Sequence, residues 1–195
     1  MKVNWKNTGR DNLRSFIGID FDDQLKKEIY RLQQQFRSHA VKGRWKHSDN
    51  FHLTLKFLDE ISMSQKQKID ELMKELCAGT GPFSLGISGA GIFPGRDAVR
   101  VLWLGLSGDL RELRQLYGSI DSGLVPIGFP QEKRAYNAHI TIGQDIVFRT
   151  GFDEIKKETE NISLAPFPVK SLYLFKSEQV QNKRVYTKVS EYILG

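Results

Sequence analysis

The chain contains almost no cysteine and no long apolar segment. Cys77 is the only cysteine among 195 residues, so no intrachain disulfide can form, as is typical of proteins in reducing compartments. No apolar run approaches the roughly 20 residues that cross a bilayer. The polar start of the sequence lacks the apolar core of a signal peptide. We therefore expect a cytoplasmic protein without a membrane segment.

Several motifs of large enzyme classes are also missing. The sequence has no G-x-S-x-G turn of serine hydrolases, no P-loop and no G-x-G-x-x-G dinucleotide fingerprint. We therefore expect no nucleotide cofactor and no serine nucleophile. Cys77 lies among apolar residues at helical spacing, which favours a position in the core over a role as a nucleophile.

Positive charge exceeds negative charge along the chain. Lysine and arginine number 29 against 23 aspartates and glutamates, which gives a net charge of +6 and a pI of about 9.4. A basic surface attracts polyanions such as nucleic acids. Hydrophobic residues make up 39% and charged residues 27%, as in a compact globular protein. The composition favours an anionic ligand without identifying it.

Strand and helix patterns alternate in the first half of the chain. Short apolar segments bounded by charge predict strands, and apolar residues three and four apart predict helices. The first helix is expected to begin at Asp22, whose carboxylate suits an N-cap. The predicted elements are a strand at 15–21, a helix at 22–36, a strand at 51–58, a helix at 64–77 and a strand at 83–88.

The same order returns after a stretch rich in glycine, 89–95, which is too short for a flexible linker. Asp109 is the expected N-cap of the next helix. The predicted elements are a strand at 99–106, a helix at 109–120, a strand at 137–143, a short helix at 152–160, a strand at 168–176 and a last strand at 184–193.

This duplicated order predicts an α+β protein of two packed lobes. We expect one bilobal domain over residues 1–195. Its approximate repeat halves are 15–88 and 98–176, and the strand at 184–193 closes the fold.

Each copy carries His-x-Thr in its middle strand. Side chains alternate between the two faces of a strand, so the apolar residues of FHLTLKFL, Phe57 included, are expected to share one face. The opposite faces present His52, Thr54 and Lys56 in the first copy, and His139 and Thr141 in the second. Two such motifs at matching places in a repeat favour one shared site over two unrelated strands.

Paired imidazoles suit displacement at phosphorus. Opening a 2′,3′-cyclic phosphate needs a base that takes a proton from water and an acid that protonates the departing ribose oxygen. Imidazole titrates near pH 6.5, so a neutral ring and a protonated ring coexist near neutrality. The threonine hydroxyls can donate hydrogen bonds to the non-bridging oxygens, and Lys56 would add a positive charge. The residues alone leave open which histidine is the acid.

These motifs resemble those of the two-histidine (2H) phosphoesterases. The nearest branch is the RNA 2′,3′-cyclic phosphodiesterases of bacteria and archaea, formerly called 2′-5′ RNA ligases. The resemblance covers nearly the whole chain. It includes Arg44-Trp45 ahead of FHLTLKFL, GIFPGRDAVRVLWLGL in the middle, AHITIG at the second motif, and the region from Ser177 to Tyr186 followed by YIL.

The resemblance implies a bilobal 2H-phosphoesterase-like fold with two pseudo-symmetric lobes. Mainly antiparallel sheets, flanked by helices, would enclose a central cleft with one His-x-Thr on each wall. It implies metal-independent hydrolysis of the cyclic phosphate of RNA or oligonucleotide ends to a 2′-phosphate, with His52 as proton donor and His139 as proton acceptor. Small cyclic nucleotides are further expected substrates. We also expect a monomer without a cofactor.

Two positions depart from the usual pattern of that family. Ala138 stands where proline commonly precedes the second histidine. Gly143-Gln144-Asp145 stands where a basic residue often follows the second motif. We expect another cation to take the place of that residue, and the candidates are Lys56, Lys46 and Arg134.

A binding protein remains an alternative to an enzyme. A basic cleft that holds RNA ends without turnover would use the cluster Arg44-Trp45-Lys46, in which Trp45 stacks on a base. Trp45 suits a core or rim position equally well.

A metal hydrolase is a second alternative. It would combine the two strand histidines with acids such as Asp59, Glu60 or Asp145. Metal sites commonly show ligands at short spacings, which this sequence lacks. We therefore expect no metal. His39 and His47 lie in polar segments, and we expect both to be structural or solvent-facing.

Overall fold

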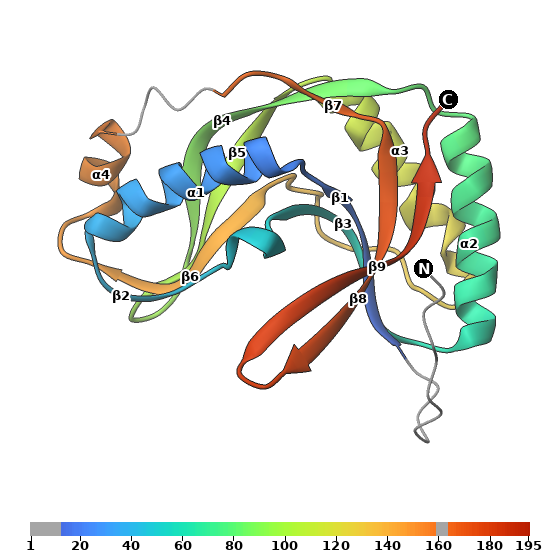
Figure 1. The fold of residues 1–195 in the computed structure, drawn as a ribbon, viewed down its shortest axis with the longest axis horizontal. Helices are drawn as coiled ribbons and strands as arrows, with labels where there is room; N and C mark the ends of the chain where they lie inside the picture. The colour runs from blue at the N-terminus through green and yellow to red at the C-terminus, as the bar shows by residue number, and fades with distance from the viewer. Residues whose placement is uncertain (1–12, 159–163) are drawn as a thin grey trace.

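Two antiparallel sheets form the centre of the protein, seen here in a computed structural model that describes residues 13–158 and 164–195 (Figure 1). The first sheet has the strand order β3-β1-β8-β9, and the second has the order β2-β6-β5-β4-β7. The strands are β1 (Leu13–Asp20), β2 (Ala40–Trp45), β3 (His52–Ile61), β4 (Phe83–Pro94), β5 (Val99–Gly108), β6 (Ile140–Phe148), β7 (Phe167–Val169), β8 (Ser171–Val180) and β9 (Lys183–Ile193).

Helices cover both sheets, so the predicted α+β class with mainly antiparallel sheets is confirmed. Contacts link α2 to β9 and α3 to β3, whereas α1 contacts β6 and η1. The helices are α1 (Asp23–Ser38), α2 (Met63–Ala78), α3 (Leu110–Gly123) and α4 (Phe152–Glu158), with 3₁₀ turns η1 (Ser48–Asn50) and η2 (Val125–Ile127). None of the described helices is both long and apolar enough to span a membrane.

Each sheet draws strands from distant parts of the chain. β2 and β4 lie in the second sheet although β1 and β3 lie in the first, and β8 returns to pair with β1. The chain therefore passes between the sheets several times. This interleaving places the two strands that carry the histidine motifs, β3 and β6, in different sheets that contact each other.

Helix α1 forms where the apolar spacing predicts it. Asp22 is its N-cap, and the carboxylate accepts a hydrogen bond of 2.7 Å from the backbone N–H of Leu25, as expected. Ile29 and Phe36 are fully buried on its inner face. Asp109 is the N-cap residue of α3, as predicted, although its carboxylate accepts from the backbone N–H of Ser84 and not from the helix.

The glycine-rich stretch at 89–95 is part of a strand and not a joint. β4 runs without interruption to Pro94, beyond the predicted end at residue 88. Gly89 has φ +68° where the pairing with β5 shifts register, so it forms a bulge in which a side chain is disfavoured. A Cβ at Gly91 would overlap the indole of Trp103. These glycines keep the strand continuous while it bends.

Other differences follow from context that one segment cannot reveal. The predicted strand at 168–176 is two strands, β7 and β8, which belong to different sheets. β2 was not predicted because it is an edge strand with lysine, glycine and arginine in its sequence and a largely exposed surface. Residues 159–160 of the predicted fourth helix lie outside the described residues.

Irregular pairing changes the faces of β3 beyond Thr54. The register against β1 shifts twice, so Leu58 is buried and Phe57 is 69% exposed. The prediction that Phe57 shares the apolar face is therefore wrong, because β-bulges interrupt the alternation. Cys77 is fully buried in the core, as predicted.

Candidate active site

His52 is the first residue of β3, and its ring is fixed at both nitrogens. Nδ1 lies 2.7 Å from the backbone oxygen of Asn50, and Nε2 lies 2.9 Å from the hydroxyl oxygen of Thr54. A carbonyl oxygen only accepts hydrogen bonds, so Nδ1 carries the proton and the Thr54 hydroxyl donates to Nε2 of the neutral ring.

His139 immediately precedes β6 and repeats half of this arrangement. Its Nδ1 lies 2.7 Å from the backbone oxygen of Asn137, again two residues earlier in the chain. β6 begins at Ile140, three residues later than the predicted start at residue 137. The carbonyl contact holds the neutral ring in the same tautomer as His52, with Nε2 as its unprotonated nitrogen.

The sequence repeats more than His-x-Thr around each histidine. Both copies read Asn-x-His-x-Thr, at 50–54 and 137–141. The oxygens that hold the rings are backbone atoms, so the contacts do not themselves require asparagine. The side chain of Asn50 has a separate role, because its Nδ2 donates to the backbone oxygen of Arg184 in β9 at 2.8 Å.

Burial lowers the pKa of both imidazoles. For His52 the loss of solvent lowers the pKa to about 4, opposed by the hydrogen bond to Asn50 and assisted by the positive charge of Lys46. For His139 burial again lowers the pKa, and the hydrogen bond to Asn137 opposes it. Both rings are therefore neutral at pH 7 in the free protein.

Aromatic side chains surround both histidines, and sequence reasoning missed them. Phe16 lies 4.6 Å from the His52 ring between centroids, and Tyr186 meets that ring edge-on at 5.1 Å. Phe93 meets the His139 ring edge-on at 5.2 Å. These residues come from strands distant in sequence, so no local pattern could have connected them to the motifs.

Hydrogen bonds between the lobes bring the two motifs together. Tyr136, three residues before His139, donates from its hydroxyl to the backbone oxygen of Thr54 at 3.0 Å. The buried amide of Gln33 donates to the backbone oxygens of Lys46, at 2.8 Å, and Ile142, at 2.7 Å. The segment before His52 and the strand after His139 are thus tied to the same side chain. Thr54 and Thr141 are both half-buried beside the motifs.

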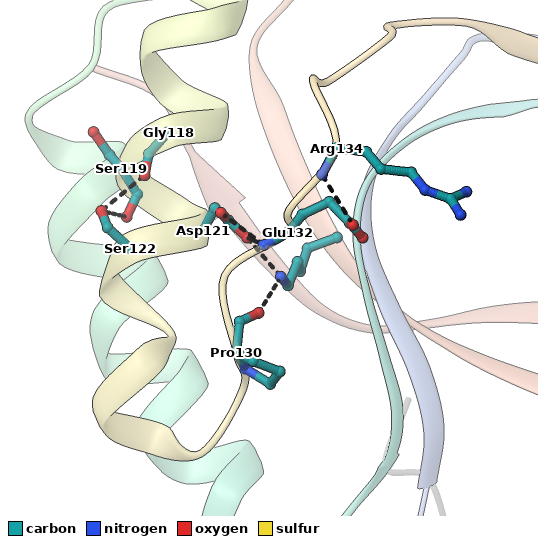
Figure 2. Close-up of polar contacts among 8 residues, drawn as sticks. Gly118, Ser119, Asp121, Ser122, Pro130, Glu132 and Arg134 are labelled. Carbon is teal, nitrogen blue, oxygen red and sulfur yellow. Dashed lines mark hydrogen bonds and ion pairs between the residues drawn. The ribbon is translucent and has the colours of Figure 1, made fainter.

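Lys56 does not provide the free cation that was expected. Its ammonium group donates to the Asp121 carboxylate at 2.5 Å and to the backbone oxygen of Pro130 at 2.7 Å, and both members of the ion pair are about nine-tenths buried. Asp121 also accepts from the backbone N–H of Glu132, and Figure 2 shows it facing this loop. The ion pair anchors the loop that leads to His139. The sequence did not show that Lys56 is paired, because its partners, Asp121 and this loop, are distant from it in sequence.

The other predicted binding residues differ in position. Lys46 donates to the hydroxyl of Tyr186 at 3.0 Å and lies near enough to His52 to lower its pKa. Trp45 is half-buried at the end of β2, paired with Gly143. Arg134 is exposed, and its side chain extends away from Asp121 in Figure 2. Of these residues, Lys46 is the cation that the structure places beside a histidine.

The remaining polar candidates have separate contacts. Asp145, which stands where the family often has a cation, accepts hydrogen bonds from Arg44, with the Nε contact at 2.8 Å. His47 is exposed and caps η1, and His39 ends α1. Across residues 13–158 and 164–195, no three histidine, cysteine, aspartate or glutamate side chains gather as a metal site would require.

A family model described as LigT like Phosphoesterase matches the chain twice, at residues 19–103 and 104–186. The chain belongs to this family. Each match contains one His-x-Thr motif, so the duplication expected from the sequence coincides with two copies of the family unit. The resemblance to two-histidine phosphoesterases is confirmed.

Relatives of this LigT-like phosphoesterase match it over almost its full length. The RNA 2′,3′-cyclic phosphodiesterase of Methanothermobacter thermautotrophicus is 28% identical over 93% of this chain and 99% of its own. That of Methanocaldococcus jannaschii is 30% identical, over 92% and 100%. The crystal structure of E. coli LigT complexed with 3′-AMP superposes with a TM-score of 0.77 at 26% identity, covering 94% and 98%. The two-lobed fold is therefore that of LigT.

The ion pair predicts a structural role for Lys56. Lys56→Met should lower the free energy of unfolding by about 3–5 kcal/mol, because the Asp121 carboxylate stays buried without a cation. The double variant Lys56→Met/Asp121→Leu should recover most of that loss. Urea denaturation measures both, with the exposed Lys42→Met as a control that should change stability by less than about 0.5 kcal/mol. A Lys56→Met protein of normal stability would contradict this role.

Proposed function

We propose that this LigT-like phosphoesterase hydrolyses the 2′,3′-cyclic phosphate ends of RNA to 2′-phosphates, with His52 and His139 as its acid and base. One observation carries the proposal: His52 at the start of β3 and His139 immediately before β6 both have Nδ1 bound to the backbone carbonyl two residues earlier. This contact leaves Nε2 of each neutral ring unprotonated, and we infer that both Nε2 atoms face one phosphate, as an in-line displacement needs.

The proposed reaction adds one water molecule across one P–O bond. Nε2 of His139 takes a proton from water as the water oxygen attacks phosphorus. The bond between phosphorus and the ribose 3′ oxygen breaks, and the His52 imidazolium protonates that oxygen, which leaves the phosphate on the 2′ oxygen. The assignment of donor and acceptor follows the family resemblance, since both rings have the same hydrogen-bonded tautomer.

The low pKa of His52 fits a donor that is charged only with substrate bound. In the free protein its Nε2 accepts from Thr54. A phosphate anion favours the imidazolium and so raises the pKa of the ring, while the Thr54 hydroxyl becomes available to a non-bridging oxygen. Lys46 provides a further positive charge nearby. Negative charge that develops in the transition state would be stabilised by these groups.

The known relatives support the choice of substrate. The archaeal relatives are RNA 2′,3′-cyclic phosphodiesterases, and E. coli LigT forms a complex with 3′-AMP. We propose cyclic-phosphate ends of RNA as the substrate class of this chain and small cyclic nucleotides as secondary substrates. We propose that the reaction uses no metal. The proposed active unit is the whole chain as a monomer, and the proposed compartment is the cytoplasm, in agreement with a single, buried cysteine.

Removal of either imidazole should abolish most of the turnover. With a 2′,3′-cyclic-ended RNA in EDTA, His52→Ala and His139→Ala should each lower kcat by about 10²- to 10⁴-fold. Thr54→Val and Thr141→Val should each cost about 1–3 kcal/mol, or about 5- to 150-fold, as lost charge-assisted hydrogen bonds. Chromatography identifies the product, which should be only the 2′-phosphate.

The control for these variants is His39→Ala, which lies at the end of α1 and should retain full turnover. Binding of the RNA end without turnover by the wild-type protein would replace the enzyme with a binding protein. Activity that disappears in EDTA and returns with zinc or manganese would favour a metal hydrolase.

The rate should peak at acidic pH when substrate is scarce. The active pair holds one proton, and burial lowers the pKa of both rings below 6.5, so the singly protonated pair is most populated below that pH. kcat/KM should therefore peak below pH 6.5 and fall toward pH 8, whereas kcat should peak at higher pH because bound phosphate raises the pKa of the acid. Profiles from pH 4 to 9 test this, and a flat profile would exclude paired imidazoles.

A further inference from the structure

A groove lies next to the His52 segment, with β2 of the second sheet and the β8–β9 hairpin of the first sheet both in its lining. Its volume is about 860 Å³, and its walls come from α1, β2, η1 and the β8–β9 hairpin, which projects from the first sheet (Figure 1). A smaller hollow of about 330 Å³ lies against His52 itself. Asp49 and Tyr186 line both spaces, so the groove adjoins the hollow at the histidine.

One residue, Asn50, connects the groove to the histidine. The Asn50 backbone oxygen accepts from His52, and its side-chain amide donates to the backbone oxygen of Arg184. Asn50 therefore links β9, which forms one wall of the groove, to the imidazole through two hydrogen bonds. A ligand in the groove would lie in a defined position relative to the reacting phosphate.

Positive charge lines the groove. Its cationic residues are Arg37, Arg44, Lys46, Lys183 and Arg184. Arg44 is paired with Asp145, and Lys46 contacts Tyr186. Arg37, Lys183 and Arg184 are exposed, and their side chains form no ion pair with any described residue. The carboxylate of Asp49 is the acidic group in the lining, so the balance of charge favours a polyanion.

Aromatic rings lie among these cations. Tyr30 of α1 is 44% exposed, and Trp45 and Tyr186 are half-buried in the same lining. Base stacking on such rings contributes about 1–3 kcal/mol per base and tolerates any sequence. Unpaired cations beside stacking platforms are the combination that holds single-stranded nucleic acid.

We propose that this groove binds the single-stranded RNA immediately upstream of the cyclic phosphate, with backbone phosphates on Arg37, Lys183 and Arg184 and bases against the aromatic side chains. This inference rests on the proposed function of the adjoining histidines. Its consequence is a preference for cyclic-ended oligonucleotides over cyclic mononucleotides, because a mononucleotide leaves the groove empty.

Salt-dependent binding of a short RNA tests the groove. The probe is a 5′-fluorescein hexaribonucleotide with a 2′-phosphate end, followed by anisotropy from 0.05 to 0.3 M salt. Each phosphate contact on a single strand contributes about 0.7 to the slope of log K against log salt. Lys183→Gln/Arg184→Gln should reduce that slope by about 1.4, which corresponds to about 25-fold weaker binding at 0.1 M salt.

A matched pair of substitutions separates local contacts from net charge. Lys68→Gln/Lys74→Gln removes the same charge from exposed positions on α2, across the first sheet from the groove, and should leave the slope unchanged. If both pairs of substitutions weaken RNA binding equally, or if neither pair weakens it, the proposed RNA-binding role of the groove is wrong. Displacement of the hexamer by a polyglutamate peptide at equal charge concentration would overturn the choice of RNA.

Turnover separates this inference from the proposed function. Wild-type protein should hydrolyse a 2′,3′-cyclic hexamer with a kcat/KM at least 10-fold higher than a 2′,3′-cyclic mononucleotide. If it hydrolyses the mononucleotide equally well, the function stands and the groove is refuted. If it hydrolyses neither substrate, the function fails, and the hexamer affinities of the variants still decide whether the groove binds RNA.

Discussion

The hydrogen bond from a histidine Nδ1 to a backbone carbonyl two residues earlier is the constraint on which the site depends. It occurs at both His52 and His139, with the same length of 2.7 Å. The bond fixes the tautomer and the direction of each ring, so that Nε2 is the atom left for proton transfer. Burial beside aromatic residues adds a second constraint, because it lowers the pKa of both rings and so favours their neutral forms at pH 7.

Polar contacts between the two repeat halves hold the two histidine motifs in position relative to each other. Tyr136 reaches the backbone at Thr54, and Gln33 joins the backbone oxygens of Lys46 and Ile142. The ion pair of Lys56 with Asp121 holds the loop before His139. Buried groups of this kind are costly to leave unpaired, so each contact disfavours displacement of one motif from the other.

Sequence reasoning reached the features that depend on local pattern. The period of apolar residues predicted the helices, Asp22 was identified as a cap, and the repeated His-x-Thr indicated the two histidines. It failed where a distant partner decides the outcome. Nothing near Lys56 in the sequence points to Asp121. β-bulges turned Phe57 outward. The cations of the groove lie on elements far apart in the chain, so only the fold reveals them together.

Nitrogen NMR of the histidine rings tests the central claim most directly. In protein labelled with ¹⁵N-histidine, 2′-AMP is titrated while the Nε2 resonances of His52 and His139 are followed. If the two imidazoles converge on one phosphate, both resonances should shift with one dissociation constant, both ring pKa values should rise, and both Nδ1 atoms should stay protonated. A response from one ring alone, or two different dissociation constants, would contradict the convergence of the two imidazoles on one phosphate.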